Sequence, residues 1–213
     1  MRCDKKDLLL YGVTDRSWLG DRTLAQQVEA SLRGGATMIQ LREKHMDRGS
    51  ILAQALELRE LCGRYGVPLI LNDDAELAQA AGADGVHVGQ SDMEAGRVRA
   101  LLGEDKLIGV SARTVEQALA AQAAGADSLG VGAMFPTGTK QDTRPVSYDT
   151  LKAICAAVDI PVVAIGGIGA GNVAELAGSG IAGVAVVSAL YAQPDVEAAT
   201  RSLRAQVERV VGP

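Results

Sequence analysis

Short apolar runs alternate along the chain with longer stretches in which apolar residues recur three and four positions apart. The runs are typical of buried strands, and the longer stretches are typical of amphipathic helices. The pattern predicts strands at residues 8–14, 38–42, 69–72, 85–88, 107–110, 128–131, 162–165 and 183–187. It predicts helices at residues 24–33, 50–65, 75–81, 94–102, 115–124, 148–158, 173–177 and 196–211. Because a helix follows every strand, we expect an α/β fold, a single (β/α)8 TIM barrel over residues 1–213.

A similar tripeptide recurs between a predicted helix and the next predicted strand, in every second strand–helix repeat. It reads Gly-Ala-Thr at 35–37, Gly-Ala-Asp at 82–84 and 125–127, and Gly-Ile-Ala at 180–182. Asp84 and Asp127 therefore fall at strand starts, the end of a barrel that serves stability. We leave both residues out of the candidate site.

Two acids follow neighbouring predicted strands in the stretch ILNDDAELAQAAGADGVHVGQSDM, residues 70–93. Asp73 comes directly after one strand, and Asp92 lies shortly after the next. Parallel strands bring their carboxyl ends to one edge of a sheet, where barrels keep their chemistry. The pair suggests a Mg²⁺ site completed by substrate phosphate. The alternative is that each acid caps the helix that follows it, and the residues alone leave both interpretations open.

The second predicted strand alternates polar and apolar side chains. Gln40, Arg42 and Lys44 share one face, because successive side chains of a strand point to opposite sides. Helices cover the outside of a parallel barrel, so we expect this polar face to point into the mouth. A strand at the edge of a sheet, with one face exposed to solvent, would show the same alternation. Ser111, after the fifth strand, either donates to an anion or caps a helix.

Two loops have the composition of phosphate sites. Residues 132–147, GAMFPTGTKQDTRPVS, form the longest stretch without a regular pattern and carry Thr137, Thr139 and Lys140. Such a loop is either functional or a solvated surface segment. The glycine-rich residues 166–172 and Ser188 follow the last two strands, where barrels often bind phosphate. A monophosphate fits this stretch better than a dinucleotide, since no acidic residue follows at the required distance.

The remaining aromatic and imidazole side chains give weaker signals. His87 lies between two valines in a strand, so we expect a hydrogen-bonded core imidazole rather than a catalytic base. His45 is expected in a loop. Trp18 and Phe135 could pack against an aromatic substrate ring, and the pattern places neither.

Composition narrows the class of protein. The chain has 213 residues, 47% of them hydrophobic but only 3% aromatic, and 25 glycines, which suits one core with many tight connections. A net charge of −5 argues against a general nucleic-acid surface. Three cysteines without metal-binding spacing are expected as free thiols. We expect no membrane association and a cytoplasmic location, since neither a signal peptide nor a long apolar segment stands out.

Seven motifs together resemble the thiamine phosphate synthase family over nearly the whole chain. They are LYGVTD (10–15), IQLREK (39–44), LND (71–73), GVHVGQSD (85–92), GVSART (109–114), PTGTK (136–140) and IGGI (165–168). The resemblance implies a transferase that condenses hydroxymethylpyrimidine diphosphate with a thiazole phosphate, or its carboxylated form. The products would be thiamine monophosphate and pyrophosphate. The implied partners are these phosphorylated small molecules, and a homo-oligomer is compatible with the family.

The resemblance also implies residue roles. Asp73 and Asp92 would bind Mg²⁺. The pyrimidine diphosphate would contact Gln40, Arg42, Lys44, Asn72, Ser111 and Lys140, of which Ser111 and Lys140 would act in catalysis. The thiazole phosphate would contact Thr137, Thr139, Gly167, Val187 and Ser188. Asp74 departs from the family pattern, which commonly has a basic or neutral residue there, and puts the charge at the metal edge in question.

Two other functions remain as alternatives. A thiazole tautomerase, an isomerase of the same pathway, looks similar in sequence but would need a proton-transferring residue rather than paired acids. A non-catalytic phosphate-binding barrel would need neither.

Overall fold

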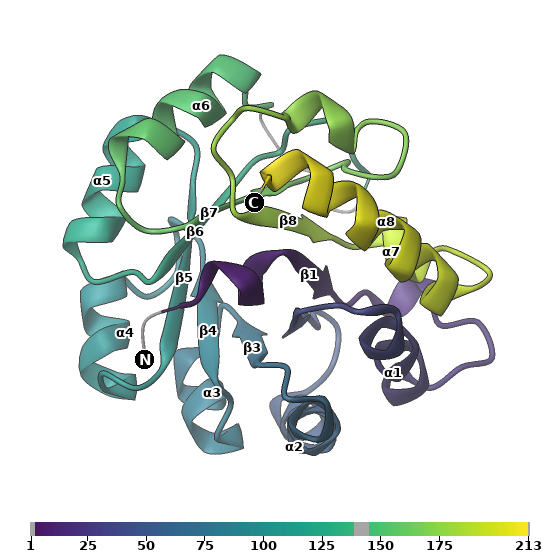
Figure 1. Ribbon diagram of the computed structural model, residues 1–213. Helices are drawn as coiled ribbons and strands as arrows, with labels where there is room; N and C mark the ends of the chain where they lie inside the picture. Colours follow the sequence, from purple (N-terminus) through teal and green to yellow (C-terminus); the bar gives the residue numbers. More distant parts are fainter. Residues whose placement is uncertain (1–2, 139–144, 213) are drawn as a thin grey trace.

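The computed structural model describes residues 3–138 and 145–212 and contains a closed barrel of parallel strands in the order β1 to β8. A ring of helices surrounds the barrel (Figure 1). The strands are β1 (Leu10–Val13), β2 (Met38–Leu41), β3 (Leu69–Asn72), β4 (Gly85–Val88), β5 (Leu107–Ala112), β6 (Ser128–Val131), β7 (Val162–Ile165) and β8 (Gly183–Val186). The TIM-barrel prediction is confirmed.

Among the described residues, the α-helices lie where the sequence predicts them, except for the short α7 after β8, which was not predicted. They are α1 (Leu24–Gly34), α2 (Arg48–Tyr65), α3 (Ala75–Ala81), α4 (Ala95–Leu102), α5 (Val115–Ala123), α6 (Tyr148–Ala157), α7 (Ser188–Tyr191) and α8 (Val196–Val211). Three short 3-10 helices are η1 (Lys5–Leu8), η2 (Arg16–Trp18) and η3 (Val173–Leu176). Side chains that accept a backbone N–H begin the long helices; Thr23, for example, forms a reciprocal capping box with Gln26.

Several predicted bounds differ from the structure by a few residues, and two of the differences have a local cause. Leu8 ends η1 instead of opening the first strand, because Asp4 accepts the Lys6 N–H and stabilises a tight turn there. The predicted helix over 173–177 is the 3-10 helix η3, whose preceding residue Asn172 makes no side-chain cap.

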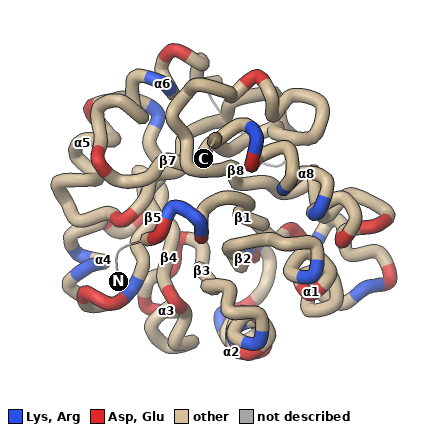
Figure 2. The backbone as a smooth tube through the Cα atoms, viewed as in Figure 1, with Lys and Arg blue, Asp and Glu red and all other residues tan. Residues whose placement is uncertain are grey.

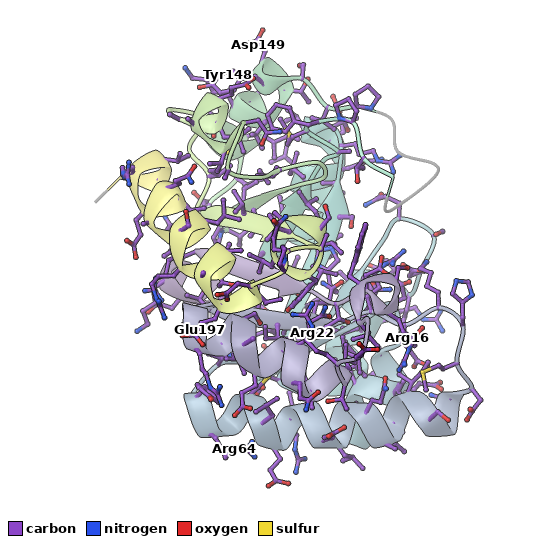
Figure 3. All side chains as sticks on the ribbon, turned by 90° about the vertical axis from the view of Figure 1, so that its right-hand side faces the viewer. Arg16, Arg22, Arg64, Tyr148, Asp149 and Glu197 are labelled. Atoms are coloured by element: carbon purple, nitrogen blue, oxygen red, sulfur yellow. The ribbon has the colours of Figure 1, made fainter. Side chains whose placement is uncertain are left out.

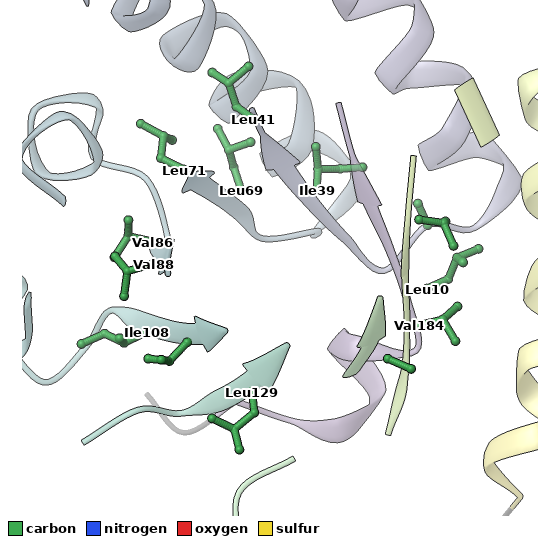
Figure 4. Packing of buried hydrophobic residues seen from close by; sticks show 14 of the residues in the cluster. Leu10, Ile39, Leu41, Leu69, Leu71, Val86, Val88, Ile108, Leu129 and Val184 are labelled. Carbon is green, nitrogen blue, oxygen red and sulfur yellow. The ribbon is translucent and has the colours of Figure 1, made fainter. Parts of the chain in front are cut away.

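Apolar side chains form two separate clusters, one on each side of the barrel wall. The outer cluster lies between strands and helices and includes Leu10, Ile39 and Leu69; Figure 4 shows its members around the wall. The smaller cluster fills the barrel interior with Leu8, Tyr11, Val13, Met38, Ile70, Leu107, Val163 and Ala185. Strand side chains alternate between the two, so the interior above the smaller cluster is left for polar residues.

The recurring tripeptide has a structural role at the N-terminal end of the barrel. The Leu10 N–H donates to Thr37 Oγ1 at 2.9 Å, and the N–H groups of Leu69 and Ile108 donate to Asp84 Oδ2 and Asp127 Oδ2 at 2.8 Å. These side chains clamp the starts of β1, β3 and β5. Asp84 and Asp127 therefore lie far from the barrel mouth, as predicted.

Charged residues lie mostly on the helices and loops around the barrel (Figure 2). A side view shows Arg16, after β1, at the right and Arg64, at the end of α2, at the lower left (Figure 3). Across residues 3–138 and 145–212, no helix is both long and apolar enough to cross a membrane.

Candidate functional site

A cavity of about 160 Å³ opens at the carboxyl ends of the strands and is lined from all eight of them or their loops. Eight of the predicted site residues line it: Gln40, Arg42, Asn72, Ser111, Thr137, Gly167, Val187 and Ser188. The structure therefore brings together residues from both predicted subsites. Thr139 and Lys140 lie outside the described residues.

Strand β2 presents its polar face to the cavity. Gln40 and Arg42 line the cavity, whereas Ile39 and Leu41 belong to the outer apolar cluster. Gln40 Nε2 donates to the hydroxyl of Tyr11 at 2.8 Å. Burial raises the pKa of Tyr11, so the phenol stays protonated at the base of the cavity. The expectation that the polar face points into the mouth is confirmed for Gln40 and Arg42. Tyr11 was not predicted as part of the site.

Lys44 lies at the rim rather than in the cavity. Its Nζ is 3.9 Å from Asp73 Oδ2. The neighbouring Glu43 accepts from Arg16 Nε at 2.6 Å, and from the N–H groups of Lys44 and His45. This contact joins the loops after β1 and β2, and it fixes the segment that carries Lys44.

The carboxyl groups of Asp73 and Asp92 face each other at the ends of β3 and β4. Burial, repulsion from Asp92 and a hydrogen bond between the two groups raise the pKa of Asp73, with the Lys44 ammonium opposing them. Asp92 Oδ2 also accepts the Gly89 N–H at 2.7 Å. Two carboxylates this close favour a shared proton or a shared cation.

Neither acid caps the helix that follows it, so the capping alternative is wrong. Helix α3 is capped by Asp74, which accepts the Leu77 N–H at 2.8 Å, and α4 is capped by Glu94. Asp73 itself has φ of 66°, the one non-glycine positive value among the described residues. Asp74 also lies 3.3 Å from Arg48. Its carboxyl group is therefore engaged at the start of α3 and with Arg48, and not with the Asp73–Asp92 pair.

Ser111 is held from two sides at the end of β5. Its Oγ lies 2.9 Å from His87 Nε2, and its carbonyl accepts from Gln90 Nε2 at 2.6 Å. The His87 imidazole is hydrogen-bonded, as expected. It lines the cavity, however, and is not packed within the apolar core. A Cβ at Gly109 would lie 2.4 Å from His87 Nδ1. The ring therefore occupies space that only glycine on β5 leaves open.

The opposite rim is built from the loops after β7 and β8. Gly166 and Gly167 have φ of 98° and 67°, and a Cβ at Gly167 would lie 2.5 Å from the Pro136 carbonyl oxygen. Only glycine tolerates this conformation and this contact together. Asn172 fixes the loop by accepting the Gly169 N–H and donating to the Gly167 carbonyl, both at 2.9 Å. The short helix α7 begins at Ser188, beside this loop in the same cavity.

Sequence reasoning did not place Tyr11, His87 or Arg113 in the candidate site, and all three line the cavity. Arg113 falls within the motif GVSART, so its two-residue spacing from Ser111 was the available signal. Trp18 is exposed on η2 and Phe135 packs against the outer cluster. Neither aromatic residue is part of the cavity lining that the described residues form.

Comparisons with known proteins agree on one family. The family model described as thiamine monophosphate synthase matches residues 10–190. The thiamine-phosphate synthase of Ruminiclostridium cellulolyticum is 48% identical to this chain, and the match covers 93% of this chain and 95% of that protein. The thiamine-phosphate synthase of Chloroflexus aurantiacus is 50% identical, and the match covers 94% of this chain and 93% of that protein. A solved structure, the thiamine phosphate pyrophosphorylase from Pyrococcus furiosus, is 38% identical with a TM-score of 0.90 and covers 98% of this chain and 99% of its own.

These matches extend over the whole barrel, and the cavity contains residues from the motifs that prompted the expectation. The chain therefore belongs to the thiamine monophosphate synthase family.

Proposed function

We propose that the cavity at the barrel mouth is where this chain carries out the reaction of its family. That reaction is the transfer of a hydroxymethylpyrimidine group from its diphosphate to a thiazole phosphate, which yields thiamine monophosphate and pyrophosphate. The observation that carries the proposal is the paired acids, Asp73 and Asp92, at one rim of a cavity whose own lining is cationic and polar. The barrel elements run from residue 5 to residue 211, which supports treating residues 1–213 as one domain.

The pyrimidine diphosphate belongs, in this proposal, to the side formed by β2 to β5. Gln40, Arg42, Asn72 and Ser111 line the cavity there, and Lys44 lies at the rim. Arg42 supports the assignment because its guanidinium has no hydrogen bond or ion pair with the described part of the chain. The oxygens of a diphosphate would accept the hydrogen bonds that the Arg42 guanidinium can donate. The resemblance adds Lys140 to this group.

The thiazole phosphate belongs to the side formed by β6 to β8. Thr137 offers a hydroxyl, and Gly167, Val187 and Ser188 offer backbone amides beside the start of α7. The positive φ angles of Gly166 and Gly167 let the backbone approach a ligand closely. Barrels commonly bind a phosphate at this position, with a short extra helix completing the site. The resemblance adds Thr139.

Mg²⁺ fits the pair of acids. Hard cations take carboxylate oxygens, and Mg²⁺ is usually bound by one or two carboxylates together with substrate phosphates. Among the described residues no cluster of three or more His, Cys, Asp or Glu surrounds one point, so diphosphate oxygens or water would complete the coordination. When bound, the ion would neutralise charge that develops on departing pyrophosphate. Asp73 and Asp92 would hold it, and the Lys44 ammonium favours the ionised form of Asp73.

The chemical step is a substitution at the pyrimidine methylene carbon. We propose a dissociative order, in which the carbon–oxygen bond to the diphosphate breaks before the thiazole nitrogen attacks. Arg42 and Ser111 would stabilise the charge on the departing oxygens by donating hydrogen bonds already in place. The nitrogen attacks with its own lone pair, so no residue has to remove a proton. This fits a cavity whose one histidine, His87, is engaged with Ser111.

The finer statements about compartment and assembly are proposals too. We place the reaction in the cytoplasm because Cys3, Cys62 and Cys155 are all free, as expected in a reducing environment. A homo-oligomer is the proposed assembly, on the family resemblance alone.

Incubation with both substrates, with and without Mg²⁺, tests the proposal. Thiamine monophosphate and pyrophosphate should form in equal amounts, and only with the metal. Conversion of a thiazole isomer without pyrophosphate would identify the tautomerase instead. Binding of both phosphates without any product would identify a non-catalytic barrel.

A further inference from the structure

Arg113 lies at the barrel mouth immediately beyond β5, two residues after Ser111, and it lines the cavity. Its backbone N–H donates to Gln117 Oε1 at 2.8 Å, which anchors the residue to the first turn of α5. The side chain is half-buried. Neither the motif assignments nor the comparisons give it a role.

Arg113 is one of the few charged residues among those that line the cavity. Of the described residues that line it, Arg42 and Arg113 are the two with a formal charge, and neither an aspartate nor a glutamate is among them. The lining therefore carries two positive charges on a chain whose net charge is −5. Such local concentration of one sign is typical of a site for a multiply charged anion.

The Arg113 guanidinium has no hydrogen bond or ion pair within residues 3–138 and 145–212, although the residue is half-buried. Arg99, by comparison, pairs with Asp127 at 2.6 Å and donates to three backbone carbonyls. A partly buried guanidinium without acceptors is unfavourable until a ligand supplies them. The cavity is where that ligand would enter.

We propose that Arg113 is a further substrate-binding residue, which pairs with the diphosphate of the pyrimidine substrate. This rests on the proposed division of the cavity. Ser111, two residues earlier and on β5, belongs to the diphosphate side, and β5 adjoins β4, which leads to Asp92. Arg42 and Arg113 approach from the ends of β2 and β5, so they would hold the diphosphate from two directions. A guanidinium can make two parallel hydrogen bonds to phosphate oxygens, whereas an ammonium cannot.

The test uses Arg113→Gln and Arg113→Lys, with Arg97→Gln as the matched control. Arg97 is an exposed arginine on α4 without a described partner, so its loss removes the same charge away from the cavity. The KM for each substrate is measured separately. The Kd of inorganic pyrophosphate with Mg²⁺ is measured by calorimetry, and urea midpoints check folding.

Arg113→Gln should raise the KM for the diphosphate and the Kd of pyrophosphate by on the order of tenfold. The KM for the thiazole phosphate should stay within about twofold of the wild-type value, and Arg113→Lys should fall between the two proteins. Arg97→Gln should match the wild type. Unchanged values in Arg113→Gln, or a rise confined to the thiazole phosphate, would overturn the inference. A wild-type protein that released no pyrophosphate would instead overturn the proposed function, and calorimetry of pyrophosphate binding would still decide the role of Arg113.

Discussion

His87 Nε2 lies 2.9 Å from Ser111 Oγ, a contact that crosses from β4 to β5 inside the cavity. The imidazole lies against Gly109 and Gly130, where added Cβ atoms would lie 2.4 Å from Nδ1 and 2.9 Å from Cε1. Two glycines on neighbouring strands thus make the space for the ring, and the ring orients the serine hydroxyl. The geometry of the candidate site therefore depends on glycine at positions 109 and 130 as well as on His87 and Ser111.

Gly109→Ala should therefore damage both stability and activity. The new methyl group would force the His87 ring from its position, and overpacking of this kind costs about 1–3 kcal/mol. The urea midpoint should fall, and the rate of pyrophosphate release should fall beyond what unfolded protein explains.

Gly63→Ala is the matched control for this change. Gly63 lies within α2, and a Cβ there would meet nothing within 4 Å. Alanine in a helix interior is favoured over glycine by about 0.5–1 kcal/mol, so the free energy of unfolding should rise. If Gly109→Ala behaved like this control, the position of the ring would not depend on the glycine.

Asp73→Ala and Asp92→Ala should each abolish Mg²⁺-dependent pyrophosphate release. Each change removes half of the carboxylate pair, and the leaving group then lacks its counter-charge. Asp74→Ala is the control, because Asp74 caps α3 and pairs with Arg48. Its loss should lower stability by about 0.5–2 kcal/mol while release still depends on Mg²⁺. Undiminished release by the first two variants would remove the metal site from the proposal.

The same pair predicts a pH dependence of folding without metal. Burial and Asp92 raise the pKa of Asp73 above its usual 3.8, so the folded state binds the proton more tightly than the unfolded state. The free energy of unfolding should then fall as pH rises from 3.8 through the folded-state value. In EDTA, Asp73→Asn should gain stability over the wild type near neutral pH and lose that advantage in acid. Urea unfolding across this range checks it, and a pH-independent difference would contradict it.

Much of the site could be predicted from the sequence because strands impose a simple geometry. The period-two alternation of β2 was enough to place Gln40 and Arg42 in the mouth, since one face of every barrel strand must meet the helices. The equivalence of Thr37, Asp84 and Asp127 also followed from repeated spacing. Each of these inferences uses only the backbone period and the closure of the barrel.

Other features depend on contacts that spacing does not encode. Whether Asp73 or Asp74 caps α3 is decided by the backbone, because φ of 66° turns Asp73 out of the helix start. His87 could be recognised as hydrogen-bonded, but its place in the cavity depends on glycines from two other strands. Arg113 could not be separated from a surface arginine, since that distinction requires knowing which carboxylates lie near it.

Gln90 connects the two halves of the proposed diphosphate side. Its Nε2 donates to the Ser111 carbonyl at 2.6 Å, while the neighbouring Gly89 N–H donates to Asp92 Oδ2 at 2.7 Å. The loop that carries Asp92 is thereby tied to the strand end that carries Ser111. We predict that Gln90→Met, which keeps the length of the side chain but removes its donor, raises the Mg²⁺ concentration for half-maximal activity by up to about tenfold.

Gln79→Met is the control for that change, because Gln79 Nε2 makes the same type of bond to the Leu101 carbonyl at 2.9 Å on the outside of the barrel. Both glutamines are exposed, so both variants should unfold near the wild-type urea midpoint. Only the Gln90 variant should change the Mg²⁺ titration, since only its bond reaches the segment with Asp92. Equal titrations for the two variants would mean that the loop keeps its geometry without this hydrogen bond, and that Asp92 is positioned by the Gly89 amide alone.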